Sequence, residues 1–564
     1  MWSGADHKDQ ALAGRALAAL VLIVILAPMN GCGGQAVRDD PKEITQVVTI
    51  PDPSVLGYIR ADAAAAAGVV ELAEGLLNQR DRVPGLTLLF RSLPWDMIFK
   101  ALPLAAPGSE MILVFLDPGT FGGGGALAFQ PSEKGGLVRL LDADPDYART
   151  GDDPPQFRMI RQSDMSREIF LALDALSALG FDLDLPAQDL PLACVIEEDE
   201  RGVLILPSYD SRRDVRAFLE STDYLSPWGD AGLVVHLDMR RLAVAYADTL
   251  RSLESSVRKI AAKLDATRPV DHPITPGRVL RFGCATLLGF LGGIEGVRFV
   301  SVAPDSGEAE LRILAREGKS LHRFLGVLGE HGPAKTGLVP GGWAAQIHID
   351  PSQTVGLLQE LNAFYTSVLD LEPGTLDECT VALRRCVNLD DGGYLLGLGI
   401  GENGLWGGLF SRMRDEDLHE LIDSARWRAA AAVAALVGGE LDPRERPGAV
   451  NAERLIRRFE LQGGDYRLET GVGGGFHVAV LEPIPAEDSA DRRRHALISQ
   501  LVRLADIGVP RTRRLPSKAH IYLKFSLVPF SQGATGVLGS LIVGDVNGVG
   551  RVEGRELVLR CPWR

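Results

Sequence analysis

The chain has 564 residues, of which 46% are hydrophobic and 24% are charged. These proportions are ordinary for a folded globular protein, and the length is enough for about two to four domains. The formal net charge of −15 argues against nucleic acid as a partner, because nucleic-acid-binding proteins need clustered lysine and arginine.

The first element in chain order is a short apolar run from Ala16 to Ala27, which follows a polar segment with Lys8 and Arg15. A helix needs about 20 apolar residues to span a bilayer, so this run is too short to do so. Its length is typical of the apolar core of a secretory signal. We therefore predict that the chain is exported.

The run is followed by Met29-Asn30-Gly31-Cys32. This segment resembles the lipobox of bacterial lipoprotein precursors, in which a small residue precedes the modified cysteine, although Asn30 departs from the usual pattern. The resemblance covers residues 1–32 and implies a signal peptide over 1–31, lipidation of Cys32 and a membrane partner through the lipid. It also implies a protein of the cell envelope that faces the periplasm, in the outer rather than the inner membrane because Gly33 follows the cysteine.

Residues 32–45 are glycine-rich and charged, which suits a flexible tether between the lipid and the folded part. Beyond the tether, four β-rich segments recur, each introduced by a proline, and the first three reach an aspartate. They cover residues 55–62, 232–238, 343–350 and 519–524.

The second of these segments is followed by a long amphipathic helix near 239–264 and an apolar helix near 277–293. Two strands come next, near 296–303 and 308–315, and the second of them alternates between apolar and charged residues. A short helix near 320–329 follows. Around the first segment the same order is predicted, with strands near 111–117 and 125–131 and a helix near 132–142.

These patterns predict an α+β fold of repeated β-α-α-β-β-α units, which form antiparallel sheets with helices on one face. We divide the chain into three α+β regions, 46–225, 226–338 and 339–564. Polar, proline-rich segments between periodic stretches predict linkers. They lie at 143–160, 268–276, 438–450 and 483–494.

Five cysteines follow Cys32, so at least one thiol stays free or pairs between chains, and the sequence does not fix the pairing. Cys379 and Cys386 could form a disulfide only if the chain between them is irregular, because seven residues span about 10 Å in a helix. We expect Cys194 and Cys284 to be buried and inert. The fifth is Cys561.

Ser256-Val257-Arg258-Lys259, with Lys335-Thr336-Gly337 downstream, resembles two of the three motifs of serine β-lactamases and penicillin-binding proteins. The resemblance would make Ser256 a nucleophile and Lys259 its activating partner. The third motif is absent, and Ser256 falls in the middle of the predicted long helix. Surface polar residues are therefore the favoured interpretation.

The segment from Asp545 to Glu556 matches a calcium-binding loop at several positions and gives Asp545, Asn547 and Glu556 as candidate ligands. Val549 supplies no side-chain oxygen at the fifth position. We favour a β-hairpin that turns at Asn547-Gly548.

The segment Gly399 to Gly404 spells a dinucleotide fingerprint, but a strand follows it where a helix is required, so a glycine-rich hairpin is favoured. His236 and His348 each stand two residues before an aspartate, Asp238 and Asp350. A paired histidine site is conceivable if two units face each other, and polar residues on strands are the ordinary alternative.

No coherent catalytic set and no cofactor motif is found. The sequence therefore favours a lipid-anchored envelope protein with a non-enzymatic binding or structural role. Its partner would be another envelope protein or an apolar ligand. The alternatives are a periplasmic serine hydrolase and a calcium-dependent binding module.

Overall fold

The structure is a computed structural model that describes residues 54–62, 100–121, 125–160, 193–221, 231–267, 275–302, 308–330, 336–339, 343–349, 351–369, 371–401, 404–413, 415, 421–422, 424–425, 428, 431, 454–461, 464–473, 475–483, 518–526 and 545–562. Over these residues the chain forms one open sheet of 19 strands, and every pairing in it is antiparallel. The predicted α+β class and the antiparallel strands are confirmed, whereas the predicted separate sheets are one continuous sheet.

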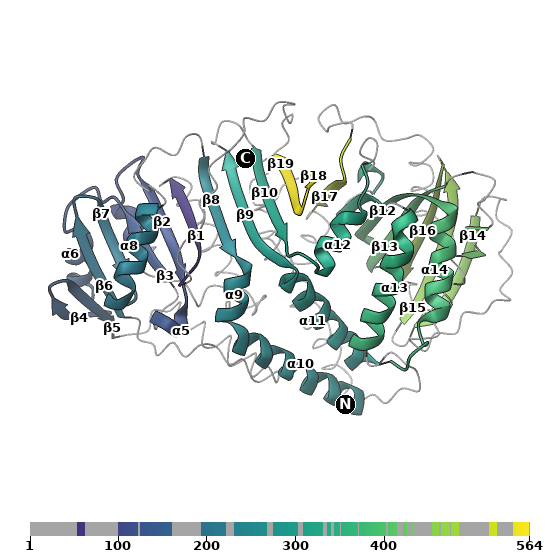
Figure 1. The fold of residues 1–564 in the computed structure, drawn as a ribbon, viewed down its shortest axis with the longest axis horizontal. Coiled ribbons are helices and arrows are strands. Elements are labelled where there is room, and N and C mark those ends of the chain that lie inside the picture. Colours follow the sequence, from purple (N-terminus) through teal and green to yellow (C-terminus); the bar gives the residue numbers. More distant parts are fainter. Residues whose placement is uncertain are drawn as a thin grey trace.

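One edge of the sheet holds the strands of the first region (Figure 1). From the edge inward, the order is β4 (Tyr147–Asp152), β5 (Pro155–Met159), β6 (Ala193–Asp199), β7 (Gly202–Leu206), β3 (Gly125–Phe129), β2 (Glu110–Leu116) and β1 (Val55–Asp62). The prediction of a linker at 143–160 is wrong, because β4 and β5 lie within it. The two strands form a hairpin at the edge of the sheet, and their few apolar residues alternate with polar or charged ones.

The middle of the sheet joins residues that are far apart in sequence. Next to β1 come β8 (Ala231–Asp238), β9 (Ile294–Val302) and β10 (Glu308–Ala315). The neighbour of β10 is the last of the described strands, β19 (Glu556–Pro562), followed by β18 (Asp545–Glu553) and β17 (Ile521–Ser526).

The other edge is built by the rest of the third region. The strands run outward from β17 in the order β11 (Trp343–His348), β12 (Asp390–Gly401), β13 (Gly404–Met413), β16 (Phe476–Pro483), β15 (Gly464–Gly473) and β14 (Arg454–Leu461). The C-terminal strands therefore lie between the second region and the remainder of the third.

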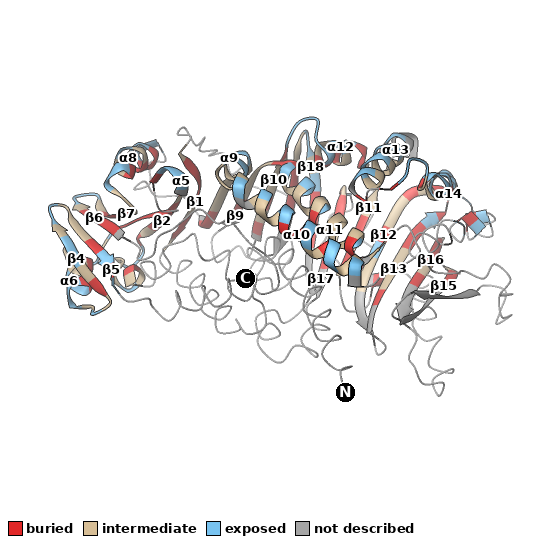
Figure 2. Cartoon of the chain, turned by 90° about the horizontal axis from the view of Figure 1, so that it is seen from below, coloured by how far each residue is buried: buried red, intermediate tan, exposed pale blue. Residues whose placement is uncertain are grey.

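Along the chain, most of the described α-helices connect strands of the middle of the sheet and of the second edge. They are α5 (Pro118–Phe121), α6 (Gly136–Ala143), α8 (Arg212–Ser221), α9 (Met239–Ala245), α10 (Ala247–Thr267), α11 (Pro276–Gly292), α12 (Ser320–Val327), α13 (Pro351–Val368) and α14 (Asp377–Leu389). Short 3₁₀ helices are η2 (Leu102–Leu104), η3 (Tyr209–Ser211) and η4 (Thr336–Leu338). Along α10 and α11, exposed residues interleave with half-buried and buried ones (Figure 2). Of the helices described, none combines the length and the apolarity that crossing a membrane requires.

The long helix predicted after Asp238 is two helices, α9 and α10, separated at Tyr246. Asp238 ends β8 and caps α9, because its carboxylate accepts hydrogen bonds from the backbone N–H groups of Arg240 and Arg241 at 3.0 Å each. The polar residue that stops the strand in the sequence pattern is thus the residue that starts the helix.

Residues directly opposite each other on paired strands project from the same side of a sheet, so the register allows each side to be followed from strand to strand. We call face A the side that carries Leu113 and Leu311, and face B the side that carries Val114 and Phe410.

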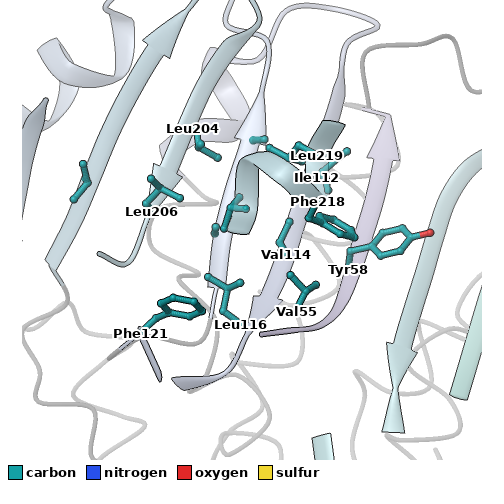
Figure 3. Close-up of a cluster of buried hydrophobic side chains, with 14 of the residues drawn as sticks. Val55, Tyr58, Ile112, Val114, Leu116, Phe121, Leu204, Leu206, Phe218 and Leu219 are labelled. Atoms are coloured by element: carbon teal, nitrogen blue, oxygen red, sulfur yellow. The ribbon is translucent and has the colours of Figure 1, made fainter. Parts of the chain in front are cut away.

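The prediction that helices cover only one face is wrong for the first region. Helix α6 packs against face A of β2 and β3 through Leu137 and Leu141. Helix α8 packs against face B, where Phe218 lies beside Tyr58 with the ring centroids 5.4 Å apart (Figure 3). The reason is visible in β2, where the successive residues 111 to 114 are all apolar and buried, so both sides of the strand need a cover.

Candidate binding surface

The hydrolase motif is not assembled into a site by the fold. Ser256 is buried in α10, with 1% of its surface exposed, whereas Lys259 is exposed. Lys335 lies outside the described residues, and Thr336 is buried in η4. A nucleophile needs both access to a substrate and an adjacent base, and Ser256 lacks the access.

The candidate calcium ligands lie in the hairpin of β18 and β19. Asp545 and Asn547 are strand residues opposite Ser526 and Lys524, and Glu556 begins the return strand. The hairpin itself is confirmed, but its predicted turn at Asn547-Gly548 is wrong. The chain turns at Gly554, whose φ of +62° suits glycine and whose place gives β18 its full length.

The two histidines are far apart. Five strands separate β8 from β11, so at roughly 4.8 Å per strand His236 and His348 are about 29 Å apart. His236 stacks on Tyr58, with ring centroids 5.7 Å apart, and burial together with the charge of Arg298 lowers its pKa. Asp350 lies outside the described residues. A shared histidine site is therefore not formed.

The glycine-rich segment after 399 is the favoured hairpin, since Gly401 of β12 pairs with Gly404 of β13. Cys379 and Cys386 share helix α14 and are free thiols, as are Cys194 and Cys284. Cys194 is buried as expected, and its burial raises the pKa of the thiol to about 12. Cys32 and the predicted signal lie outside the described residues.

Face A of strands β11 to β13 carries an apolar surface that the sequence analysis did not single out. Leu396 is 46% exposed although it lies on an inner strand, and its neighbours on the same face are half-buried. We call this set the β11–β13 surface: Trp343, Ala345, Leu396, Leu398 and Leu409.

Face B of the same strands is a closed core. Leu395 and Phe410 lie opposite each other there and are 1% and 0% exposed. They pack with Val339, next to η4, and with β16. The strands are thus apolar on both sides. Face B is fully buried, whereas face A is only half-buried although α13 and α14 contact β12.

Two glycines show the same difference in packing between face A and face B. A Cβ atom placed on Gly397, which is on face B, would lie 2.9 Å from Cγ2 of Val339. A Cβ atom on Gly407, opposite Leu398 on face A, would have no neighbour within 4 Å among the residues that the structure describes. The space above the β11–β13 surface is therefore open at this point.

One end of the surface is polar. Tyr394, Ser411 and His477 lie opposite one another on β12, β13 and β16, all on face A. The Ser411 hydroxyl donates a hydrogen bond of 2.9 Å to Oδ1 of Asp390, and Ser411, His477 and Asp390 are each at most 1% exposed. Tyr394 is half-buried and stands next to Leu396 along the face.

A bulge places the Asp390 carboxylate in this cluster. Asp390 pairs with Met413 and Tyr394 with Ser411, so β12 has two more residues than β13 between the two pairs. Gly392 takes a φ of +92° within the bulge. Bulges re-aim side chains, and here the bulge returns Asp390, the first residue after α14, towards Ser411.

Serine, histidine and aspartate also make up hydrolytic triads, but Ser411 donates to the carboxylate itself and all three groups are shielded from solvent. This arrangement is a buried hydrogen-bonded cluster and not an accessible nucleophile. Within the part of the chain that the structure describes, no three histidine, cysteine or acidic side chains gather as metal ligands would.

The chain was compared with protein-family models, with curated proteins and with solved structures, and none of the three comparisons gives a match.

Proposed function

We propose that this chain is a lipid-anchored envelope protein that binds an apolar molecule on the β11–β13 surface and has no catalytic role. The observation that supports the binding role is the difference between the two faces of β11 to β13. Burying an apolar side chain such as leucine is worth about 1.5–3 kcal/mol, so a half-exposed group of five such residues gains by being covered.

A repetition within the chain also supports a special role for this surface. Counted outward from the middle of the sheet, the first part has the order β10-β9-β8-β1-β2-β3-β7-β6-β5. The second part has the order β19-β18-β17-β11-β12-β13-β16-β15-β14. Each strand of the first series has a counterpart in the second, at the same place in space and in the same chain order.

Apart from the edge strand β4, we take the sheet to consist of two copies of one nine-stranded half, each assembled from the predicted β-α-α-β-β-α units. The halves would meet at the antiparallel pair of β10 and β19, where a two-fold axis perpendicular to the sheet relates them. Under this relation β1, β2 and β3 correspond to β11, β12 and β13.

The corresponding face in the first half is closed. Leu113 and Leu127, on face A of β2 and β3, are 6% and 2% exposed and pack with Leu137 and Leu141 of α6. The half-exposed state of β11 to β13 is thus specific to the second half, which is why we assign the binding role there.

Leucine in place of Gly407 should block the surface. The new side chain would enter open space, so folding is preserved, and it would lie beside Leu398 where a ligand would sit. We expect the affinity for the fluorescent hydrocarbon diphenylhexatriene, titrated into the purified full chain, to fall at least 10-fold.

A leucine in place of Gly119 is the matched control. Gly119 is exposed in α5, which follows β2 in the first half of the sheet, and its added Cβ would make only an ordinary contact with Asp117. Equal binding by all three proteins, or no binding by the wild-type chain, would reject the proposed surface.

The predicted anchor is tested at Cys32. Cells that produce the full chain and are fed radiolabelled palmitate should yield a labelled protein in the membrane fraction. Alanine in place of Cys32 should abolish the label and release the protein from the membrane, because a stable attachment needs the acyl chains. A labelled Cys32→Ala protein, or an unlabelled wild type, would remove the anchor from the proposal.

A further inference from the structure

Helices α10 and α11 form a basic hairpin at the lower margin of Figure 1, in a protein that is acidic overall. The described residues from α9 to α11 carry eight basic and three acidic side chains, a net charge of +5, whereas the whole chain carries −15. We infer that the exposed side of α10 docks on a bilayer that contains anionic lipids. This contact is separate from the β11–β13 surface and from the lipid proposed on Cys32.

The exposed basic residues of α10 recur at helical spacing, which places them on one side of the helix. They are Arg251, Arg258, Lys259 and Lys263. The exposed residues at 255, 262 and 266, on the same side, are serine and alanine, so the helix can approach a flat surface closely. The basic row from 251 to 263 is about 18 Å long at the rise of an α-helix.

The exposed acidic residues of α10 do not cancel this row. Asp248 pairs with Arg251, and Oε1 of Glu254 lies 2.6 Å from Nη2 of Arg258. Four exposed basic residues and two exposed acidic ones leave a net charge of +2 on α10. Anionic lipid head groups complement this charge, and each lysine or arginine near such a surface strengthens binding about fivefold.

The two helices are held together closely, so the hairpin presents its charges as one body. The half-buried Asp265 of α10 accepts a hydrogen bond of 2.8 Å through its Oδ1 from the backbone N–H of Gly277, in the first turn of α11. A Cβ atom on Gly277 would collide with the carbonyl oxygen of Ala261. A surface that is already ordered loses little conformational entropy when it binds.

Helix α11, next to α10, adds exposed apolar side chains. Val279 and Phe290 are 51% and 41% exposed and lie about three turns apart on one side of the helix. Figure 2, which views the molecule from below, shows exposed residues along both helices. Basic residues with exposed apolar side chains alongside are typical of segments that lie in the interface of an anionic membrane. This combination favours a bilayer over an acidic protein as the partner.

The experiment is co-sedimentation of the purified full chain with vesicles of phosphatidylcholine alone, or of equal parts phosphatidylcholine and phosphatidylglycerol. All proteins carry Cys32→Ala, so that no acyl chain contributes and the N-terminal segment is the same in each. In 0.1 M NaCl we expect about 10-fold stronger partition onto the anionic vesicles. This excess should largely disappear in 0.5 M NaCl, because salt screens exposed charges.

Glutamate in place of both Lys259 and Ala262 changes the charge of the exposed side of α10 by −3 and should lower binding to the anionic vesicles at least about 10-fold. Glutamate in place of both Arg213 and Ala217 is the matched control. It makes the same change on the exposed side of α8, which packs against face B, and should lower binding less than about 2-fold.

Circular dichroism spectra and urea midpoints show whether the double variants are folded, and the dependence on lipid and salt stands independently of them. Equal partition of the parent chain onto both kinds of vesicle, or equal losses in the two double variants, would overturn the docking of α10. Both outcomes leave the binding of diphenylhexatriene and the acylation of Cys32 unaffected, so failure here is distinct from failure of the proposed function.

Discussion

Replacing Arg60 with leucine is expected to lower the free energy of unfolding by about 3–5 kcal/mol, because it leaves a partly buried carboxylate without its partner. Arg60 is 2% exposed and lies on face B between β2 and β8. Its Nε and Nη2 donate hydrogen bonds of 3.0 and 2.5 Å to Oε2 of Glu110. Urea unfolding followed by circular dichroism measures the loss.

The net stabilisation that the Arg60–Glu110 ion pair gives to the fold is smaller than this loss of about 3–5 kcal/mol. Burial raises the pKa of Glu110 even though the adjacent Arg60 lowers it. A carboxyl group whose pKa is raised by folding favours the folded state at low pH, and this contribution is lost as the pH rises through the folded pKa. The loss caused by Arg60→Leu should therefore be smaller at pH 4 than at pH 7.

The double variant Arg60→Leu with Glu110→Leu should recover most of the stability, because two apolar residues of similar volume often replace a buried ion pair at little cost. Leucine in place of Arg251, whose ion pair with Asp248 is exposed, is the control and should cost less than about 1 kcal/mol. An Arg60→Leu loss as small as this control would show that the buried pair contributes nothing.

Alanine in place of Gly397 should cost about 1–3 kcal/mol, whereas alanine in place of Gly407 should be neutral or stabilise by up to about 1 kcal/mol. Both glycines lie on paired strands of one sheet, and they differ in the face on which the new methyl group appears. At Gly397 the methyl group meets the side chain of Val339, which is fully buried and branched at Cβ, so it has little freedom to move.

Thermal and urea unfolding of the two alanine variants measure this contrast. Gly397→Ala and Gly407→Ala are each other's control, since both remove the same conformational freedom from the unfolded chain. If both variants lose the same stability, the open space over face A does not exist, and the binding proposal loses its main support.

The local pattern of apolar and polar residues was enough to predict those helices and strands whose packing in the fold follows that pattern. Residues 308–313 alternate between charged and apolar residues and lie in β10, whose bounds are those predicted, because one side of the strand packs on α12 and the other carries charges. Asn547-Gly548 is a strong turn signal, yet the pairing of β18 with both β17 and β19 holds it in extended chain. Tertiary pairing overrode local preference there.

The residues of the candidate site could not be predicted from the sequence, for a different reason. The run of apolar residues at 395 and 396 does signal two buried or half-buried faces, and it could have drawn attention to β12. Ser411 and His477, in contrast, are 66 positions apart in the sequence and meet only because β13 pairs with β16. No spacing rule brings Asp390 to Ser411 without the bulge at Gly392.

The position of β19 has a consequence for how the protein is made. Residues 556–562 leave the ribosome after all the other described strands, and they are the ones that bond to β10. Until they emerge, the nascent chain has an open strand edge at β10, and such edges recruit other chains. A stop codon just before residue 556 would leave that edge permanently exposed and cut the sheet in two at its centre.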